Sequence, residues 1–263
     1  MNIIERYDIN RIFSKHLHHL KGFKIVCICD DSTSMREKLN KGQTKWDELE
    51  QSIEHVLNIA NEYDVECDVL FLNRPGFRKV ESIRQLNEQF SSLPQGLTPL
   101  TNSFKLAIEN NREELGEKKL LIIIFTDGCP TTNDYTGKLD PVKEFKEALQ
   151  QRNPMNRIFV TIVACTDDEY SLRYLNNWDN TIPNLDVVDD YESEKKEIYA
   201  AGKLNSTFTY GDYIAKILLG SFVKEIDELD EKPNNLNLNN ASDPMFFLII
   251  FILIVFFYNI FNK

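Results

Sequence analysis

The sequence predicts an α/β fold, with a doubly wound, mostly parallel six-stranded sheet and helices on both faces. Short runs of Val, Ile, Leu and Phe alternate with longer stretches in which apolar residues recur at helical spacing. The run at 119–126 is apolar almost throughout, which is typical of a central strand buried on both faces. The length of 263 residues suits one α/β domain with appendages.

The predicted elements follow one another along the chain in a regular order. Strands are expected at 23–29, 69–72, 78–80 (a short edge strand), 119–126, 158–164 and 185–188. Helices are expected at 46–60, 83–90, 101–115, 142–151, 170–176 and, as a last amphipathic helix, about 208–222. Strands that alternate with helices imply crossover connections, and these favour a parallel sheet covered on both faces.

Four segments are expected along the chain. They are an N-terminal helical extension at 1–20, the α/β domain at 21–224, an acidic and Asn-rich tether at 225–244, and a transmembrane helix at 245–261. The formal net charge of −11 argues against nucleic-acid binding, because that function needs a basic face. The five cysteines show no spacing typical of a disulfide framework, so we expect a reducing compartment.

The segment at 245–261, MFFLIIFILIVFFYNIF, has no polar face. As a helix it would span roughly 25 Å, near the hydrocarbon thickness of a thin membrane. This favours a membrane anchor over a buried core helix, with anchor residues that include Met245, Phe246, Phe247, Leu248, Phe257 and Tyr258. Because no signal sequence opens the chain and almost nothing follows the apolar run, we expect a single-pass tail anchor. The domain would then lie on the cytosolic side, with an internal membrane or a virion membrane both left open.

Oxygen-bearing side chains follow three of the predicted elements. Asp30-Asp31-Ser32-Thr33-Ser34 comes directly after the first strand, Thr98 precedes a helix, and Asp127-Gly128 follows the central strand. In an open parallel sheet, ligands bind beyond the carboxyl ends of the strands. Each piece alone has a structural alternative, since Ser and Thr often cap helices and Asp-Gly often forms a turn. Together, in this order, they favour a metal site.

These three pieces resemble the metal-ion-dependent adhesion site of von Willebrand factor A domains, in order and in spacing. The resemblance extends from about residue 23 to about residue 222 and includes the Rossmann-like alternation of strands and helices. Matched position by position, it assigns the metal ligands Asp30, Ser32, Ser34, Thr98 and Asp127. The chain departs from the family at Thr33, where glycine is frequent, so the backbone of that loop is less well defined.

The resemblance implies a bound Mg²⁺ or Mn²⁺ and a protein partner that supplies an Asp or Glu carboxylate to it. Hydroxyl and carboxylate oxygens suit these hard cations. Residues near enough to contribute to a partner-binding rim are Asp31, Thr33, Thr131, Thr132 and Asp134. The expected function is a membrane-anchored adhesion or assembly module, with no catalytic residues.

Two rival functions are weighed against this one. An enzyme is disfavoured because the chain lacks the glycine-rich phosphate-binding motifs and because its four histidines fall outside the predicted strand-end loops. The alternative that stays open is a structural membrane scaffold, on an organelle or in a virion with an internal membrane, whose metal site is vestigial or purely structural.

Overall fold

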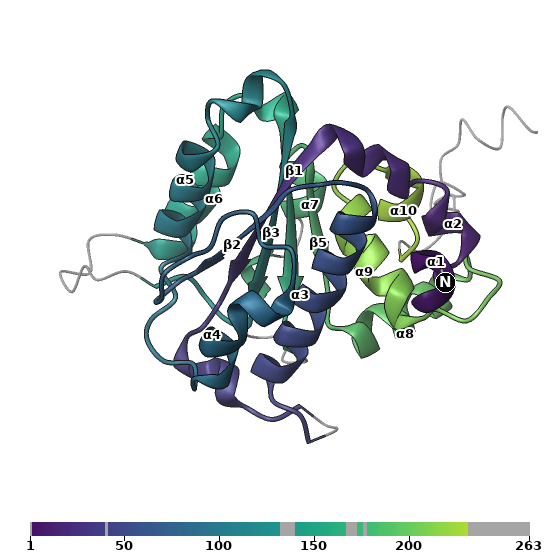
Figure 1. The fold of residues 1–263 in the computed structure, drawn as a ribbon, viewed down its shortest axis with the longest axis horizontal. Helices are drawn as coiled ribbons and strands as arrows, with labels where there is room; N and C mark the ends of the chain where they lie inside the picture. The colour runs from purple at the N-terminus through teal and green to yellow at the C-terminus, as the bar shows by residue number, and fades with distance from the viewer. Residues whose placement is uncertain (1, 40–41, 132–139, 167–172, 176–177, 231–263) are drawn as a thin grey trace, which may run out of the picture. The chain divides into compact units, whose positions relative to one another are not determined.

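A parallel β-sheet forms the centre of the fold (Figure 1). This computed structural model describes residues 2–39, 42–131, 140–166, 173–175 and 178–230. Within them the sheet has five strands in the order β2-β1-β3-β4-β5. The strands are β1 (Phe23–Cys29), β2 (Cys67–Phe71), β3 (Lys119–Thr126), β4 (Ile158–Ala164) and β5 (Leu185–Val188). The α/β class and the parallel sheet are therefore confirmed.

The predicted six-stranded sheet is wrong by one strand, the edge strand at 78–80. Phe77 forms an isolated antiparallel bridge with Val69, and the N–H of Val80 donates to Cys67 O at 2.7 Å, but these contacts do not make a strand. Lys79 has a φ of 52°, in the left-handed region that a strand cannot use. The backbone N–H of Lys79 donates to Asp68 Oδ1 at 2.9 Å, so this segment turns against β2 instead of extending beside it.

The helices lie between the strands and at both ends of the described chain. They are α1 (Ile3–Arg6), α2 (Arg11–Ser14), α3 (Lys45–Glu62), α4 (Asn87–Ser91), α5 (Leu100–Asn110), α6 (Pro141–Gln151), α7 (Trp178–Thr181), α8 (Tyr191–Ala201), α9 (Tyr210–Leu219) and α10 (Lys224–Asp227). Short 3₁₀ helices are η1 (Leu17–Gly22), η2 (Thr33–Arg36), η3 (Ile83–Leu86), η4 (Glu114–Gly116), η5 (Met155–Arg157) and η6 (Arg173–Leu175).

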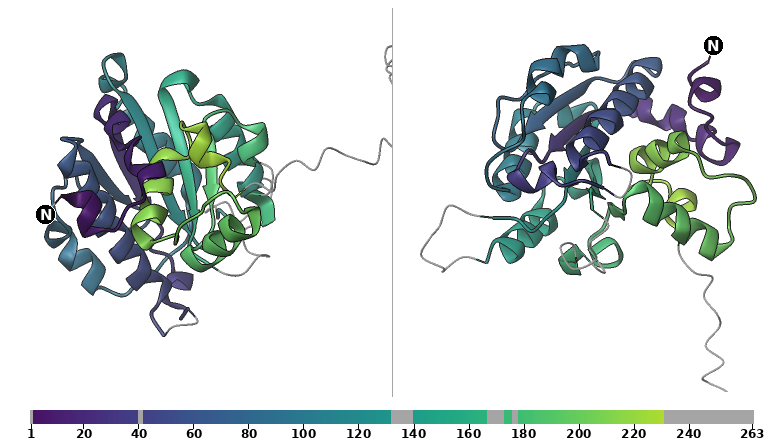
Figure 2. Two further views of the ribbon diagram at one scale, coloured as in Figure 1. Left: turned by 90° about the vertical axis from the view of Figure 1, so that its right-hand side faces the viewer. Right: turned by 90° about the horizontal axis from the view of Figure 1, so that it is seen from below.

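Two apolar cores cover the two faces of the sheet, because alternate residues of a strand point to opposite sides. Along β1, Ile25 and Cys27 belong to the core under α3 and α9, whereas Val26 and Ile28 belong to the core under α5 and α6. Figures 1 and 2 show these two helix pairs on opposite sides of the sheet. The strands are buried on both faces, as their apolar runs predict.

Both ends of the described chain pack into the core beside α9. Phe13 and Leu17 of the N-terminal extension are fully buried. Ile226 and Leu229 are also buried, although both lie within the predicted tether. The compact unit runs to Asp230, so the tether prediction is corrected at its beginning. Burial of these two side chains explains why α10 belongs to the domain.

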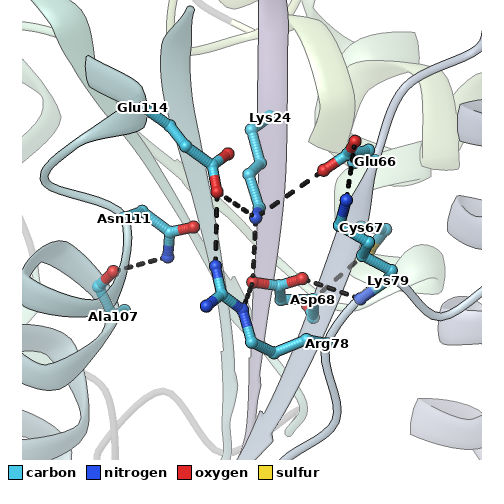
Figure 3. A network of polar contacts seen from close by, with 9 residues as sticks. All are labelled: Lys24, Glu66, Cys67, Asp68, Arg78, Lys79, Ala107, Asn111 and Glu114. Carbon is cyan, nitrogen blue, oxygen red and sulfur yellow. Dashed lines mark hydrogen bonds and ion pairs between the residues drawn. The ribbon is translucent and has the colours of Figure 1, made fainter. Parts of the chain in front are cut away.

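A polar network lies at the amino ends of β1 and β2, the opposite edge from the predicted ligands. The buried ammonium of Lys24 is 3.2 Å from Asp68 Oδ2 and 3.0 Å from Glu114 Oε1 (Figure 3). Arg78 and Lys79 add positive charge around Glu66 and the same carboxylates. The positive and negative charges are matched, so this network stabilises the sheet edge.

The predicted transmembrane helix at 245–261 and the rest of the tether lie outside the described residues. In the part of the chain that is described, none of the helices combines the length and the apolarity that crossing a membrane requires.

Candidate metal site

The first predicted loop leaves the carboxyl end of β1 in a defined conformation. Asp30 continues the sheet by one residue, since its N–H donates to Phe125 O at 2.9 Å. The Asp30 carboxylate then accepts from the N–H of Ser32 at 2.9 Å, which turns the chain into η2. Ser32 stands at the N-cap position of η2 but makes no side-chain capping bond. Its hydroxyl is therefore not used as a helix cap.

The loop after β3 meets the loop after β1. Ser34 Oγ donates to Asp127 Oδ1 at 2.7 Å, and Ser32 Oγ lies 3.1 Å from Ser34 Oγ. Thr126 Oγ1 donates to Asp30 Oδ2 at 2.7 Å. Strands β1 and β3 are neighbours, yet β2 comes between them in the sequence, so the strand order reverses here. This is the place in a doubly wound sheet where ligands bind.

The second loop is tied to both of the others. The N–H of Thr98 donates to Thr131 Oγ1 at 2.7 Å, and the N–H of Thr131 donates to Thr98 O at 2.8 Å. Gly96 N donates to Thr33 Oγ1 at 3.3 Å. All five predicted ligands thus lie on three loops that are hydrogen-bonded to one another.

The donor chemistry fits a small divalent cation. Because Ser34 gives its proton to Asp127, Ser32 is the donor in the contact between the two hydroxyls, and one lone pair of the Ser34 oxygen stays available to a metal. The described residues hold no cluster of three or more His, Cys, Asp or Glu side chains that could bind a metal. A cation here would therefore depend on hydroxyl oxygens from Ser32, Ser34 and Thr98, together with Asp30 and Asp127. Such a ligand set, with only two carboxylates, suits Mg²⁺ or Mn²⁺.

The carboxylate of Asp30 is fully buried. This burial raises its pKa to about 6, although hydrogen bonds from Ser32 and Thr126 oppose the shift. The negative charge of Asp127 raises the pKa of Asp30 further. A cation bound between the two aspartates would relieve both effects, because an opposite charge favours the ionised form.

Lys45 brings a positive charge into the site. Its Nζ lies 2.9 Å from Asp127 Oδ2 and 2.7 Å from Glu37 Oε2. Burial lowers the pKa of Lys45, but the hydrogen bonds and charges of Glu37 and Asp127 outweigh burial and leave the pKa raised. A capping box between Thr44 and Asp47 fixes the start of α3 and so positions Lys45. One oxygen of Asp127 is therefore already paired with a cation of the chain itself.

The predicted rim residues have different surroundings. The carboxylate of Asp31 is fully buried, accepts from the N–H of Asn73 at 2.8 Å and lies 2.9 Å from Arg74 Nε. Asp31 therefore supports the loop from inside, and its prediction as a rim contact is corrected. Thr33 is exposed and Thr131 is half-buried, whereas Thr132 and Asp134 lie outside the described residues.

Sequence reasoning missed Lys45 and Thr126. Thr126 ends β3 directly before Asp127, so its position at a strand end was a usable signal. Lys45 is the first residue of α3, where a cation opposes the helix dipole. A lysine at the start of a helix therefore suggests that carboxylates from other segments offset the unfavourable dipole. Here these carboxylates belong to Asp127 and Glu37.

No family model matches this chain, and no curated protein matches it. A structure of the pilus adhesin SpaC from Lactobacillus rhamnosus GG is similar, with a TM-score of 0.50 and 12% identity over 74% of this chain. The adhesin in its open conformation gives a TM-score of 0.49 at 13% identity. Manganese-loaded TRAP protein from Plasmodium vivax gives 0.39 at 11% identity, over 66% of this chain and 71% of TRAP.

This chain spans 30% of the length of the adhesin. At these identities, the likeness to SpaC concerns the fold alone: a parallel sheet between two helical layers.

Proposed function

We propose that this protein is a metal-dependent protein-binding module of the von Willebrand A type. A divalent cation, Mg²⁺ or Mn²⁺, binds to oxygens of Asp30, Ser32, Ser34, Thr98 and Asp127. The observation that carries the proposal is the contact between the first and third loops, in which Ser34 donates to Asp127 beside Ser32. The fold shared with a pilus adhesin agrees with it.

The partner supplies a carboxylate to the metal. With only two carboxylates among its five ligands, the cation would keep part of its positive charge and an affinity for a further anionic oxygen. An Asp or Glu side chain of a second protein meets that requirement. No step of bond making or breaking is proposed, and the module acts by binding.

We also propose that residues 245–261 attach the module to a membrane, because they are apolar except for Tyr258 and Asn259. A domain facing the cytosol agrees with the five cysteines, which are all free thiols. Sedimentation with membranes after alkaline carbonate washing tests the attachment. Asn205-Ser206-Thr207 matches the glycosylation sequon, and a glycan on Asn205 would contradict the cytosolic placement.

A specific observation favours the alternative, a membrane scaffold whose metal site is vestigial. Lys45 already pairs with Asp127 Oδ2, so the ammonium could replace part of the charge that a metal would bring. A scaffold of this kind would keep its partners in a chelator, whereas the adhesion module would release them.

The test is a pull-down in mild detergent with the full-length chain as bait. It is run in Mg²⁺, in EDTA, and with Thr98→Ala in Mg²⁺. We expect a partner that is captured only by the unaltered chain in Mg²⁺. A partner held equally in all three conditions would contradict metal-dependent binding and favour the scaffold.

A further inference from the structure

Two exposed leucines lie on the loop that leads into Thr98. Leu93 is 71% exposed and Leu97 is 43% exposed, and they are among the most exposed large apolar side chains of the described residues. Single exposed leucines are common on protein surfaces and need no explanation. These two differ from such leucines because hydrogen bonds hold their loop in place beside the candidate metal site.

Hydrogen bonds from three side chains, those of Arg36, Asn73 and Arg74, fix the backbone of the loop. The Arg74 guanidinium donates to the carbonyl oxygens of Gln89, Ser92 and Leu93, the last at 2.7 Å. Arg36 Nε donates to Pro94 O at 2.6 Å. The side-chain amide of Asn73 donates to Leu97 O at 2.8 Å. With these carbonyls bound, neither leucine can turn inward without breaking hydrogen bonds.

The same loop borders the candidate metal site. Gly96 exchanges two hydrogen bonds with Thr33, which lies between the ligands Ser32 and Ser34. Leu97 is the neighbour of the ligand Thr98, and successive Cα atoms are about 3.8 Å apart. Leu97 is therefore held next to a residue that would bind the metal, and Leu93 lies four residues earlier on the same hydrogen-bonded loop.

We propose that Leu93 and Leu97 form the apolar half of the partner-binding surface. The partner then presents an apolar side chain next to the carboxylate that it gives to the metal. This inference rests on the proposed function and adds which kind of partner sequence binds, namely an acidic residue beside an apolar one. An acidic residue among polar neighbours would bind through the metal alone and leave both leucines in water.

The test uses the full-length chain and four synthetic peptides immobilised at high density on beads. The peptides share one sequence except at two adjacent positions, which are Glu-Leu, Glu-Ser, Gln-Leu or Gln-Ser. Binding is measured in Mg²⁺ and in EDTA for the unaltered chain and for Leu93→Ser/Leu97→Ser. Leu106→Ser serves as the matched control, since Leu106 is 52% exposed on α5, away from this loop in the sequence.

We expect the unaltered chain to bind the Glu-Leu peptide about tenfold more tightly than the Glu-Ser peptide, in Mg²⁺ only. The double variant should lose this preference and keep its binding of Glu-Ser, and Leu106→Ser should change neither. Equal binding of Glu-Leu and Glu-Ser, or a preference that survives in the double variant, would overturn the inference.

Two further outcomes are distinguishable from these. The absence of Mg²⁺-dependent binding of both Glu peptides would contradict the proposed function itself. A change of oligomeric state in Leu93→Ser/Leu97→Ser, measured by sedimentation without peptide, would show that the leucines contact a second copy of the chain and would also overturn the inference.

Discussion

At the scale of single residues, the candidate site depends on side chains that hold other side chains in place. Asp31 is buried between Asn73 and Arg74, and these two residues also hold the loop that precedes Thr98. The D-x-S-x-S pattern made the ligands Asp30, Ser32 and Ser34 predictable. The partners of Asp31 were not, because Asn73 and Arg74 lie more than forty residues away in the sequence and carry no motif.

Gly96 is a position where the loop requires glycine. Its φ is 121°, and a Cβ atom there would clash with the side-chain amide of Asn73. We expect Gly96→Ala to lower the free energy of unfolding by about 1–3 kcal/mol, measured by urea denaturation. It should also weaken metal binding, because Asn73 holds the carbonyl of Leu97 beside Thr98. Gly116→Ala, where the added Cβ meets nothing within 4 Å, should change neither quantity.

Lys45 is expected to weaken metal binding, because its ammonium competes with the cation for the negative charge of Asp127. We expect Lys45→Met to bind Mn²⁺ several-fold to about tenfold more tightly, as measured by isothermal titration calorimetry. Lys45→Arg keeps the charge and should resemble the unaltered chain. Weaker Mn²⁺ binding in Lys45→Met would instead show that Lys45 is needed to position Asp127.

At the scale of elements, α9 is tied to its neighbours by a buried lysine. Lys216 Nζ lies 3.2 Å from Glu194 Oε1 of α8 and 3.1 Å from Asp230 Oδ2, which follows α10. Asp186 of β5 is also buried nearby and contributes a further negative charge to both Lys216 and Glu194. This cluster links α9 to Asp230, the residue at which the described chain ends.

The charge of Glu194 should make stability depend on pH. Burial raises its pKa to about 8, although the positive charge of Lys216 opposes the shift. An unfolded glutamate has a pKa of about 4.3, so between these values the folded chain holds the extra proton. This contribution to stability is therefore complete at low pH and is lost as the pH rises toward 8.

Glu194→Gln removes this contribution because glutamine does not titrate. We expect the melting temperature of Glu194→Gln, relative to the unaltered chain, to rise as the pH goes from 5 to 8. Glu88→Gln, an exposed change on α4, should show no such trend. A difference that is constant or falls with pH would contradict a raised pKa at Glu194.

The elements differ in how well the sequence predicts them, and the reason is burial. The strands β3, β4 and β5 begin and end where their apolar runs do. Helix α8 was missed because only Glu194, Ile198 and Ala201 of its residues are buried, which leaves almost no apolar period. The prediction of an edge strand at 78–80 was wrong because the backbone of Lys79 is left-handed. A pattern of apolar residues does not reveal such a backbone conformation.

At the scale of the whole molecule, the strand order brings distant segments together. The ligand Asp127 lies 93 residues after Ser34, and they meet because β1 and β3 are adjacent in the sheet. Motif order and the rule for strand ends in parallel sheets are enough to predict this meeting. They do not predict that Lys45 of α3 contacts Asp127. The rule covers residues at the ends of strands and says nothing about residues of helices.

The proposed function depends most on whether the hydroxyl and carboxylate oxygens of the three loops bind a divalent cation. The direct measurement is a calorimetric titration of the full-length chain with Mn²⁺, in parallel with Ser32→Ala/Ser34→Ala and with Ser91→Ala, an exposed control. We expect one Mn²⁺ per chain for the unaltered protein and the control, and a loss of at least about tenfold in affinity for the double variant. Equal Mn²⁺ binding in all three proteins, or no binding in any, would contradict the proposed metal site.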